Sequence, residues 1–433
     1  MPAIRQRKAI ATNKPGRDPR YERWRWQIFA ITWLAYAGFN LTRKSFAIAK
    51  IALGGPEVGL TQKQMAWIDG SFLVAYAIGQ FAWGIAADRW GTRRVVLSAM
   101  FCSVVIGFVM GSAHAASAFA ILFFLQGLCQ ASAWAPLLKN VGNFFSVRER
   151  GTMIGLWCTN YTIGGLLATV YVGYAAQWYG WRCGFFIPAA TLFGIWILFF
   201  IFQRDDPAVV GLPTIETYHA EAPAVVEDAS ETRGVFWQVL SNPMILLLGV
   251  TYFCFKPTRY AILFWGPKYV DDRLHGGMAS SGNLSALFEL AGAFSVLAGG
   301  YVSDRFCGSR RAPVSVVCLA LLGLTLLAMN ILPDIRWVLG GALFLLGFLV
   351  HAPDALISGI APIDFGSSKA ASTSSGVVTG LGAFGAVFGG VLPGVIQERW
   401  GWHGVFIILA AASFVAALLL LPKWNALPKR ASQ

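Results

Sequence analysis

The sequence predicts an all-α membrane protein in which twelve transmembrane helices form two pseudo-symmetric six-helix bundles. Three observations lead to this prediction. Of the 433 residues, 56% are hydrophobic and only 13% are charged, whereas a soluble domain has roughly 25% charged residues. About twelve apolar runs reach the roughly 20 residues that a helix needs to cross a bilayer. A pattern of residues also recurs at half the length of the chain, which indicates that one six-helix unit was duplicated.

The repeat has an offset of 216 residues. Each copy contains a Tyr-x2-Phe-x2-Thr-Arg pattern, and 45 residues after its arginine an Asp-Arg pair that follows a glycine. The residues are Tyr36, Phe39, Thr42, Arg43, Gly84, Asp88 and Arg89 in the first copy, and Tyr252, Phe255, Thr258, Arg259, Gly300, Asp304 and Arg305 in the second. A weaker echo, Gly180-Trp181 and Gly401-Trp402, precedes the sixth and twelfth runs at an offset of 221.

The apolar runs set the expected domain boundaries. They centre on 26–51, 65–87, 95–113, 118–138, 152–176, 182–202, 244–267, 280–301, 313–332, 337–361, 373–396 and 403–421. We expect a cytoplasmic basic tail (1–25), an N-terminal bundle (26–202), a cytoplasmic linker (203–242), a C-terminal bundle (243–422) and a cytoplasmic tail (423–433). The acidic, Ala-rich composition of the linker predicts a largely flexible segment. Thr61 and Gln64 predict a capping box at the start of the second helix.

The net charge of +13 is distributed in the way that is typical of a membrane protein. With both termini inside, 23 of the 34 Lys and Arg residues fall on the cytoplasmic side, 7 fall in outer loops and 4 within the spans. This positive-inside bias places both termini in the cytoplasm. We expect the basic tail to contact anionic membrane lipid and not nucleic acid. The seven cysteines lack the spacing of a disulfide framework or a metal site, and no cleavable signal peptide is expected.

Arginines inside apolar runs point to a binding site. On a helix, Arg43 shares one face with Asn40, Phe39 and Tyr36, and Arg259 shares one with Lys256, Phe255 and Tyr252. A charge at the bilayer centre costs at least ~2.5–3.5 kcal/mol, so both arginines are expected to face a cavity inside the bundle. A guanidinium matches a phosphate or carboxylate through two parallel hydrogen bonds. The symmetric pair therefore favours an anion site shared by the two halves.

The alternative is that each arginine pairs with a carboxylate and holds helices together. The acids available are Glu289, Asp354 and Asp69, against the bases Arg43, Lys44, Lys256 and Arg259. Three acids against four bases leave a surplus of positive charge. We expect Glu289 to balance Lys256 or Arg259, with a protonation site as the other possibility. His351 and Asp354, spaced i, i+3, are expected to line the cavity, and Asp69 to be solvated near the outer end of its helix.

The run from Gly84 to Arg94 predicts a conformational switch. Asp88 ends a helix on the inner face, where a carboxylate engages basic groups or a neighbouring helix N-terminus in one conformation only. We expect Asp88, Arg89, Arg93, Asp304 and Arg305 to take part, although these arginines also serve to fix topology. The sequence has no phosphate-binding loop, metal-ligand spacing or Ser-His-Asp candidate, so no enzyme, cofactor or metal is expected.

The Gly84–Arg94 run resembles the loop between spans two and three of the major facilitator superfamily. The whole chain resembles the organophosphate:phosphate antiporter branch of that superfamily. The matching residues are Arg43-Lys44, Gln126-Gly127, Gln130, Trp134, Pro136, Arg204-Asp205, Pro207, Gly211-Leu212-Pro213, Glu216, Tyr218, Arg259-Tyr260, Trp265 and Lys369-Ala370-Ala371. The resemblance implies that Arg43 and Arg259 hold a phosphate group at the interface of the halves. It also places Tyr36, Tyr76 and Lys44 around the site and matches Glu289 to the glutamate of span eight.

Several positions depart from the pattern of this branch. Tyr161 stands where members commonly carry a histidine, and Gln80 where they carry a lysine. Asn40 replaces a tyrosine of the glycerol-phosphate members, and Lys256 stands at the symmetric position. The cationic site is therefore rearranged, and a sugar phosphate, a phosphoglycerate-like anion or a phosphonate all remain candidate substrates.

The sequence as a whole predicts a monomeric inner-membrane transporter of a small organophosphate that works by alternating access. The resemblance implies inorganic phosphate as the exchange partner, with no requirement for ATP. Two guanidiniums facing an empty cavity repel each other, so only a loaded transporter is expected to change sides. The alternatives are a membrane sensor of sugar phosphate on the same scaffold and a proton-coupled transporter of organic anions.

Overall fold

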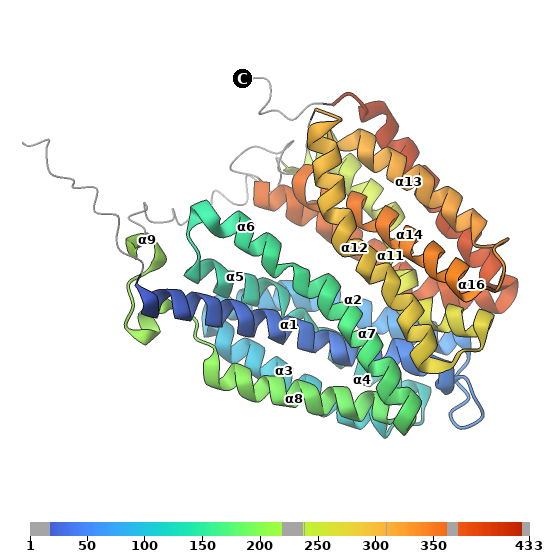
Figure 1. The fold of residues 1–433 in the computed structure, drawn as a ribbon, viewed down its shortest axis with the longest axis horizontal. Helices are drawn as coiled ribbons and strands as arrows, with labels where there is room; N and C mark the ends of the chain where they lie inside the picture. The colour runs from blue at the N-terminus through green and yellow to red at the C-terminus, as the bar shows by residue number, and fades with distance from the viewer. Residues whose placement is uncertain (1–17, 219–236, 238, 309, 362–370, 427–433) are drawn as a thin grey trace, which may run out of the picture.

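All regular secondary structure in the described part of the chain is helical. The computed structural model describes residues 18–218, 237, 239–308, 310–361 and 371–426. The expectation of an all-α fold is confirmed. Figure 1 shows the helices as two bundles, one for each half of the sequence.

The N half contains α1 to α8, followed by a short folded part of the linker. The bounds are α1 Pro19–Leu53, α2 Gln62–Trp90, α3 Thr92–Gly111, α4 Ala116–Ala131, α5 Trp134–Phe144, α6 Val147–Trp157, α7 Thr159–Tyr179 and α8 Cys183–Phe202. The 3₁₀ turn η1 (Pro207–Val210) and α9 (Ile215–Tyr218) follow. The capping box of Thr61 and Gln64 is present at the start of α2, as expected. The fourth and fifth spans are each divided into two helices, α4 with α5 and α6 with α7.

The C half repeats this plan. Its elements are α11 Pro243–Leu274, α12 Gly277–Arg305, α13 Arg311–Ala328, α14 Arg336–Ala355 with the π-helix η2 Leu356–Ile360, α16 Ala371–Leu420 and the 3₁₀ turn η3 Leu421–Lys423. The long α16 contains two spans, because Gly401 leaves helical geometry with φ 63°. Gly180, between α7 and α8, has φ 88°. Both glycines of the predicted echo therefore make the same left-handed turn, which side chains disfavour.

The twelve expected spans are confirmed by these helices. Eight helical stretches among the described residues are long and apolar enough to cross a membrane, and the last of them contains both spans of α16. The other three spans are α1, α2 and α11, with 35, 29 and 32 residues. These three carry most of the buried charged residues, which explains why composition alone marks them less clearly.

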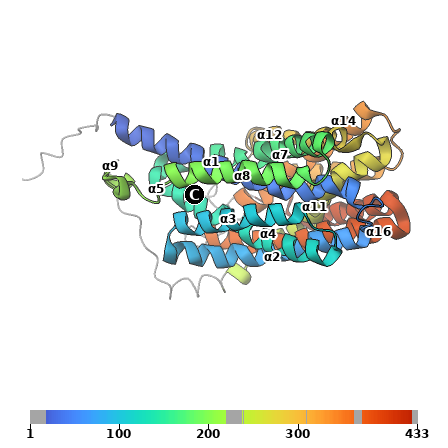
Figure 2. The same cartoon turned by 90° about the horizontal axis from the view of Figure 1, so that it is seen from below.

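The two halves meet at one end of the molecule and diverge toward the other (Figure 1). The contacts between the halves run along α1 with α11, α2 with α16, and α7 with α12, and Figure 2 shows these helices side by side in the second view. One hydrophobic cluster includes residues of both halves, among them Phe46, Phe72, Phe264 and Trp265, and it lies toward the end opposite the chain termini. The halves are therefore sealed at that end, which the sequence predicts to be the outer one.

The first part of the linker is folded against the N half, which corrects the expectation of flexibility for residues 203–218. Arg93 donates hydrogen bonds to the carbonyls of Gln203 and Phe200, and its backbone N–H donates to Asp205 Oδ1 at 2.7 Å. Tyr218 stacks on Tyr21 with ring centroids 4.1 Å apart. Linker residues 219–236 and 238 lie outside the described residues.

Candidate functional site

The arginines of the repeat lie deep in the middle of their helices. Arg43 on α1 and Arg259 on α11 are 6% and 4% exposed. Arg43 donates from Nε to Gln130 Oε1 on α4 at 2.9 Å, and its guanidinium lies 5.0 Å from the centre of the Tyr76 ring. The Phe72 ring centre lies 5.7 Å away. The partners of Arg43 among the described residues are thus a neutral amide and two aromatic rings, which leave its charge uncompensated.

Arg259 has a different environment, since it pairs with a carboxylate. Its Nη1 lies 2.5 Å from Asp354 Oδ2, and Lys256 Nζ lies 2.8 Å from Asp354 Oδ1. Tyr252 also donates to Oδ1, at 2.9 Å. Nε and Nη2 of Arg259 are buried and have no hydrogen-bond partner among the described residues. Two of the three guanidinium nitrogens therefore remain available for a ligand.

Arg259 also bridges the two halves. Its guanidinium lies 4.3 Å from the centre of the Tyr161 ring, which belongs to α7 of the N half. An arginine over an aromatic face is attracted by the ring quadrupole and keeps its hydrogen-bonding edges free. The resemblance described above implies a histidine at the position of Tyr161, so an aromatic ring stands here in place of the expected imidazole.

Glu289 also connects the two halves, at a point slightly closer to the sealed end than the contact between Arg259 and Tyr161. Its Oε1 lies 3.0 Å from Lys44 Nζ, and Thr169 donates to Oε2 at 3.1 Å. Lys44 and Thr169 belong to the N half and Glu289 to the C half. The expectation that Glu289 balances Lys256 or Arg259 is therefore wrong. Asp354 on α14 takes that role, since it pairs with both bases. The carboxylate of Glu289 instead lies against Gly165 and Thr169 of α7.

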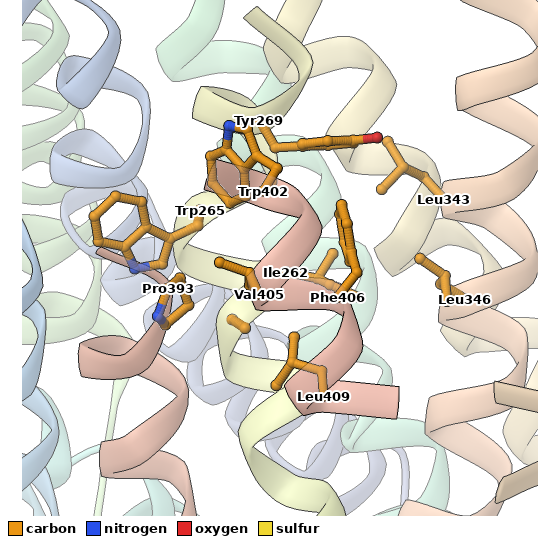
Figure 3. Close-up of a pocket in the computed structure, with 12 residues that line it drawn as sticks. Ile262, Trp265, Tyr269, Leu343, Leu346, Pro393, Trp402, Val405, Phe406 and Leu409 are labelled. Carbon is orange, nitrogen blue, oxygen red and sulfur yellow. The ribbon is translucent and has the colours of Figure 1, made fainter. Parts of the chain in front are cut away.

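A polar cavity of about 190 Å³ lies at this junction. Lys44, Thr169, Ser285 and Glu289 contribute its polar lining, and Ile262, Leu263, Pro267 and Phe288 its apolar lining. The Ser285 hydroxyl is buried without a hydrogen-bond partner among the described residues. A second hollow of about 330 Å³ lies within the C half and is lined by apolar and aromatic side chains such as Trp265, Tyr269, Trp402 and Phe406 (Figure 3). Because no charged residue lines it, it does not suit an anion.

The other predicted residues are divided between the site and its surroundings. Tyr36 packs edge-on against Trp134 and Trp157, and Asn40 donates to the Tyr36 carbonyl at 3.4 Å. Gln80 is exposed on α2, one turn beyond Tyr76 on the same face. That face meets α16 at Asp69 and Leu73, next to Gly390, so Gln80 is directed toward the opening between the halves.

Of two further expectations near the site, the one about His351 stays a prediction and the one about Asp69 is wrong. His351 is 3% exposed, its Nδ1 bonds the Gly347 carbonyl at 2.8 Å, and its ring packs on Phe288. Asp69 is not solvated, because it is fully buried and forms an ion pair with Lys50. Lys50 falls at the end of its apolar run, so the sequence suggests an outer-loop position.

Gln130 is a further site residue that sequence reasoning did not single out as such. With Gln126 it forms an i, i+4 pair on α4, and both side chains are fully buried and bond Thr42. The two glutamines orient the segment of α1 that carries Arg43. The sequence feature that could have identified this site residue is the pair of amides, Gln126 and Gln130, on one face of an otherwise apolar helix.

The predicted switch residues lie at the end where the halves diverge. Arg89 and Arg305 are exposed near the ends of α2 and α12, and Arg93 holds the linker. The side chains of Asp88 and Asp304 lie outside the described residues.

Comparison with known proteins identifies the family. The profile of the Major Facilitator Superfamily matches residues 28–375. The chain belongs to this superfamily. Its similarity to a bacterial homologue of the lysosomal transporter Spinster, solved in an inward-facing and unoccupied conformation, shows the same fold, with a TM-score of 0.75 at 14% identity over 95% of this chain and 100% of the other.

Relatives at higher identity define the branch. The chain is 30% identical to a probable hexose phosphate transport protein of Chlamydia trachomatis, over 94% of this chain and 92% of the other. It is 30% identical to the glycerol-3-phosphate transporter of Bacillus subtilis, over 94% of each chain. It is also 30% identical to the membrane sensor protein UhpC of Escherichia coli, over 96% of each. The chain is therefore a member of the organophosphate:phosphate antiporter family.

Proposed function

We propose that this protein transports a small phosphorylated organic anion across the bacterial inner membrane by alternating access, in exchange for inorganic phosphate. The observation that carries the proposal is the charge of the central site. Four buried bases, Arg43, Lys44, Lys256 and Arg259, stand against two acids, Glu289 and Asp354. In their usual ionisation states these groups leave two positive charges in excess.

A buried excess of this size needs a counter-ion, because an uncompensated charge away from water is strongly unfavourable. A phosphate monoester supplies close to two negative charges at neutral pH. The free nitrogens of Arg259 and the Nη groups of Arg43 can each bind its oxygens in a forked arrangement. Inorganic phosphate presents the same oxygens, and this supports exchange of one species for the other at a single site.

The arrangement of the halves supports alternating access. They are joined at the end opposite the termini and diverge at the other, so a ligand reaches the arginines from the terminus-bearing side. Closing that side brings Arg43 and Arg259 together, which is unfavourable while the site is empty. A bound dianion removes the repulsion. We propose that both termini are cytoplasmic, that the protein acts as a monomer in contact with anionic lipid, and that it is a transporter and not an enzyme.

The test is exchange in proteoliposomes that contain the purified protein. We expect uptake of labelled glucose 6-phosphate or glycerol 3-phosphate to be stimulated by phosphate loaded inside, and to be lost in Arg43→Lys. Binding of these esters without flux would instead assign the protein to the sensors. Uptake that ignores internal phosphate and collapses with the proton gradient would assign it to proton-coupled transporters.

A further inference from the structure

A further buried ion pair lies away from the arginine site, at the sealed end of the molecule. Lys50 on α1 and Asp69 on α2 are both fully buried and contact each other. The ammonium of Lys50 also donates to the carbonyl of Phe264 at 3.0 Å and lies 3.9 Å from the centre of the Trp265 indole. Phe264 and Trp265 belong to α11, so Lys50 joins the N half to the C half.

The internal repeat shows that packing of the helices does not require this pair. At the offset of 216, Lys50 corresponds to Gly266 and Asp69 to Ser285. These two are neighbours as well, since a Cβ on Gly266 would lie 3.4 Å from Ser285 Oγ. The same helix contact is thus made in the C half by a glycine and a serine, without any buried charge. Because a buried ion pair seldom adds stability over neutral residues, the charged version in one copy needs another reason.

The surroundings of Lys50 close the path between the halves. The Trp265 indole donates to the Gly390 carbonyl at 2.9 Å, and Gly390 packs against Asp69, where a Cβ would lie 3.2 Å from the Asp69 Cβ. Trp265 also borders the apolar hollow of the C half (Figure 3). Lys50, Asp69, Trp265 and the Gly390 backbone therefore form one continuous contact between α1, α2, α11 and α16.

We infer that Lys50 holds the two halves together at the outer end of the molecule. We call the contact of Lys50, Asp69, Trp265 and the Gly390 backbone the outer gate, and Lys50 its latch. The ion pair with Asp69 keeps the Lys50 ammonium in the N half. The hydrogen bond from this ammonium to the Phe264 carbonyl, and its contact with the Trp265 ring, attach it to the C half. Of the contacts that Lys50 itself makes, opening the sealed end breaks only these last two. Asp69 keeps the ammonium compensated during the movement, so the gate opens without leaving a bare charge. This role is independent of the substrate and of the arginine site.

The test compares neutral and charged variants of the latch by electron–electron distance measurements. Spin labels are placed on Tyr179→Cys and Ile331→Cys, exposed outer positions of the N and C halves, in a background without native cysteines. We expect Lys50→Met with Asp69→Asn to raise the long-distance, outward-open population roughly tenfold, because a hydrogen bond from a charged donor is lost. Asp69→Asn alone retains the donor and is expected to shift the population much less.

Trp265→Phe provides a second variant that keeps both charged side chains, weakens the contact of the ammonium with the ring and removes the indole hydrogen bond to the Gly390 carbonyl. It is expected to raise the open population about threefold. An unchanged distance distribution in the Lys50→Met, Asp69→Asn protein would overturn the inference. If that protein does not accumulate, an unchanged distribution in Trp265→Phe would overturn it instead. Because no substrate enters the measurement, the result does not depend on the proposed transport activity.

Discussion

At the scale of residues, the two arginines of the repeat are equivalent in sequence but not in environment. Arg43 is held by Gln130 and Tyr76 and keeps its charge uncompensated, whereas Arg259 shares Asp354 with Lys256. A ligand therefore meets one strongly cationic side and one side where a carboxylate already competes. This asymmetry favours a ligand that presents its phosphoryl group between the halves.

Arg43→Lys and Arg259→Lys should each lower exchange of phosphate esters at least tenfold without reducing expression. Lysine keeps the charge but loses the planar fork, and a hydrogen bond to a charged group contributes about 1.5–3 kcal/mol. Uptake into proteoliposomes measures the effect. Arg336→Lys, at an exposed position near the start of α14, is the matched control. Near-normal exchange in either site variant would contradict the proposed roles of the arginines.

Gly165 is required for the contact between Glu289 and the N half. A Cβ at this position would overlap the Glu289 carboxylate, which docks directly against α7. We expect Gly165→Ala to displace Glu289 from Lys44 and to reduce exchange roughly tenfold, at a cost of ~1–3 kcal/mol. Gly194→Ala is the control, since its Cβ would meet no atom within 4 Å. Equal exchange rates for the two variants would show that this contact is not needed.

At the scale of elements, α16 approaches α11 through glycines. A Cβ on Gly385 would overlap the carbonyl oxygen of Phe253, closer than real Cβ contacts allow, and would lie 3.0 Å from the Phe253 Cα. Gly382, one turn before Gly385, makes a similar approach, since its Cβ would overlap the Tyr252 ring. Small residues are a general means of bringing membrane helices together, because apolar side chains gain little by leaving lipid.

Gly385→Ala should therefore lower the free energy of unfolding by ~1–3 kcal/mol, because the two backbones must move apart. Gly380→Ala lies on the same helix with nothing within 4 Å of its Cβ. It is expected to be neutral or stabilising by up to ~1 kcal/mol through helix propensity. Thermal unfolding in detergent separates the two variants. A Gly380 variant that is less stable than the Gly385 variant would refute the packing argument.

At the scale of the whole molecule, the halves are held together from the arginine site to the outer end. Three contacts follow one another along this path. They are the Lys44–Glu289 ion pair, the hydrogen bond from Lys50 to the Phe264 carbonyl, and the hydrogen bond from the Lys63 backbone N–H to the Glu398 carboxylate. The arginine site lies where the contact ends and the opening begins. We propose that a ligand bound there touches both halves, so that its binding energy acts on their relative position.

Phosphate and its esters should accordingly raise the thermal stability of the purified protein. A ligand present at a hundred times its dissociation constant stabilises by ~2.7 kcal/mol. We expect phosphate monoesters and inorganic phosphate to raise the unfolding temperature of the unchanged protein. We expect no such rise in Arg259→Lys. Uncharged sugars serve as the ligand control. If glucose stabilised the protein as strongly as glucose 6-phosphate, the anion would not be the recognised group.

The sequence by itself determined the number of spans, the duplication and the residues that carry the buried charge. These follow from local properties: the length of an apolar run, a repeated spacing and the cost of an arginine in a helix that crosses the membrane. The sequence also predicted that Arg43 and Tyr36 share one face of their helix, because helical periodicity is a property of a single segment.

Only the tertiary structure decided which charges meet. Glu289 reaches Lys44, Asp354 reaches Arg259, and Asp69 is buried against Lys50. Each of these pairs joins residues of different helices, and in the first the helices belong to different halves. Their pairing depends on how the helices rotate and tilt when they pack, and periodicity along one helix does not specify this. The sequence therefore specified the charges, and the packing of the helices assigned their partners.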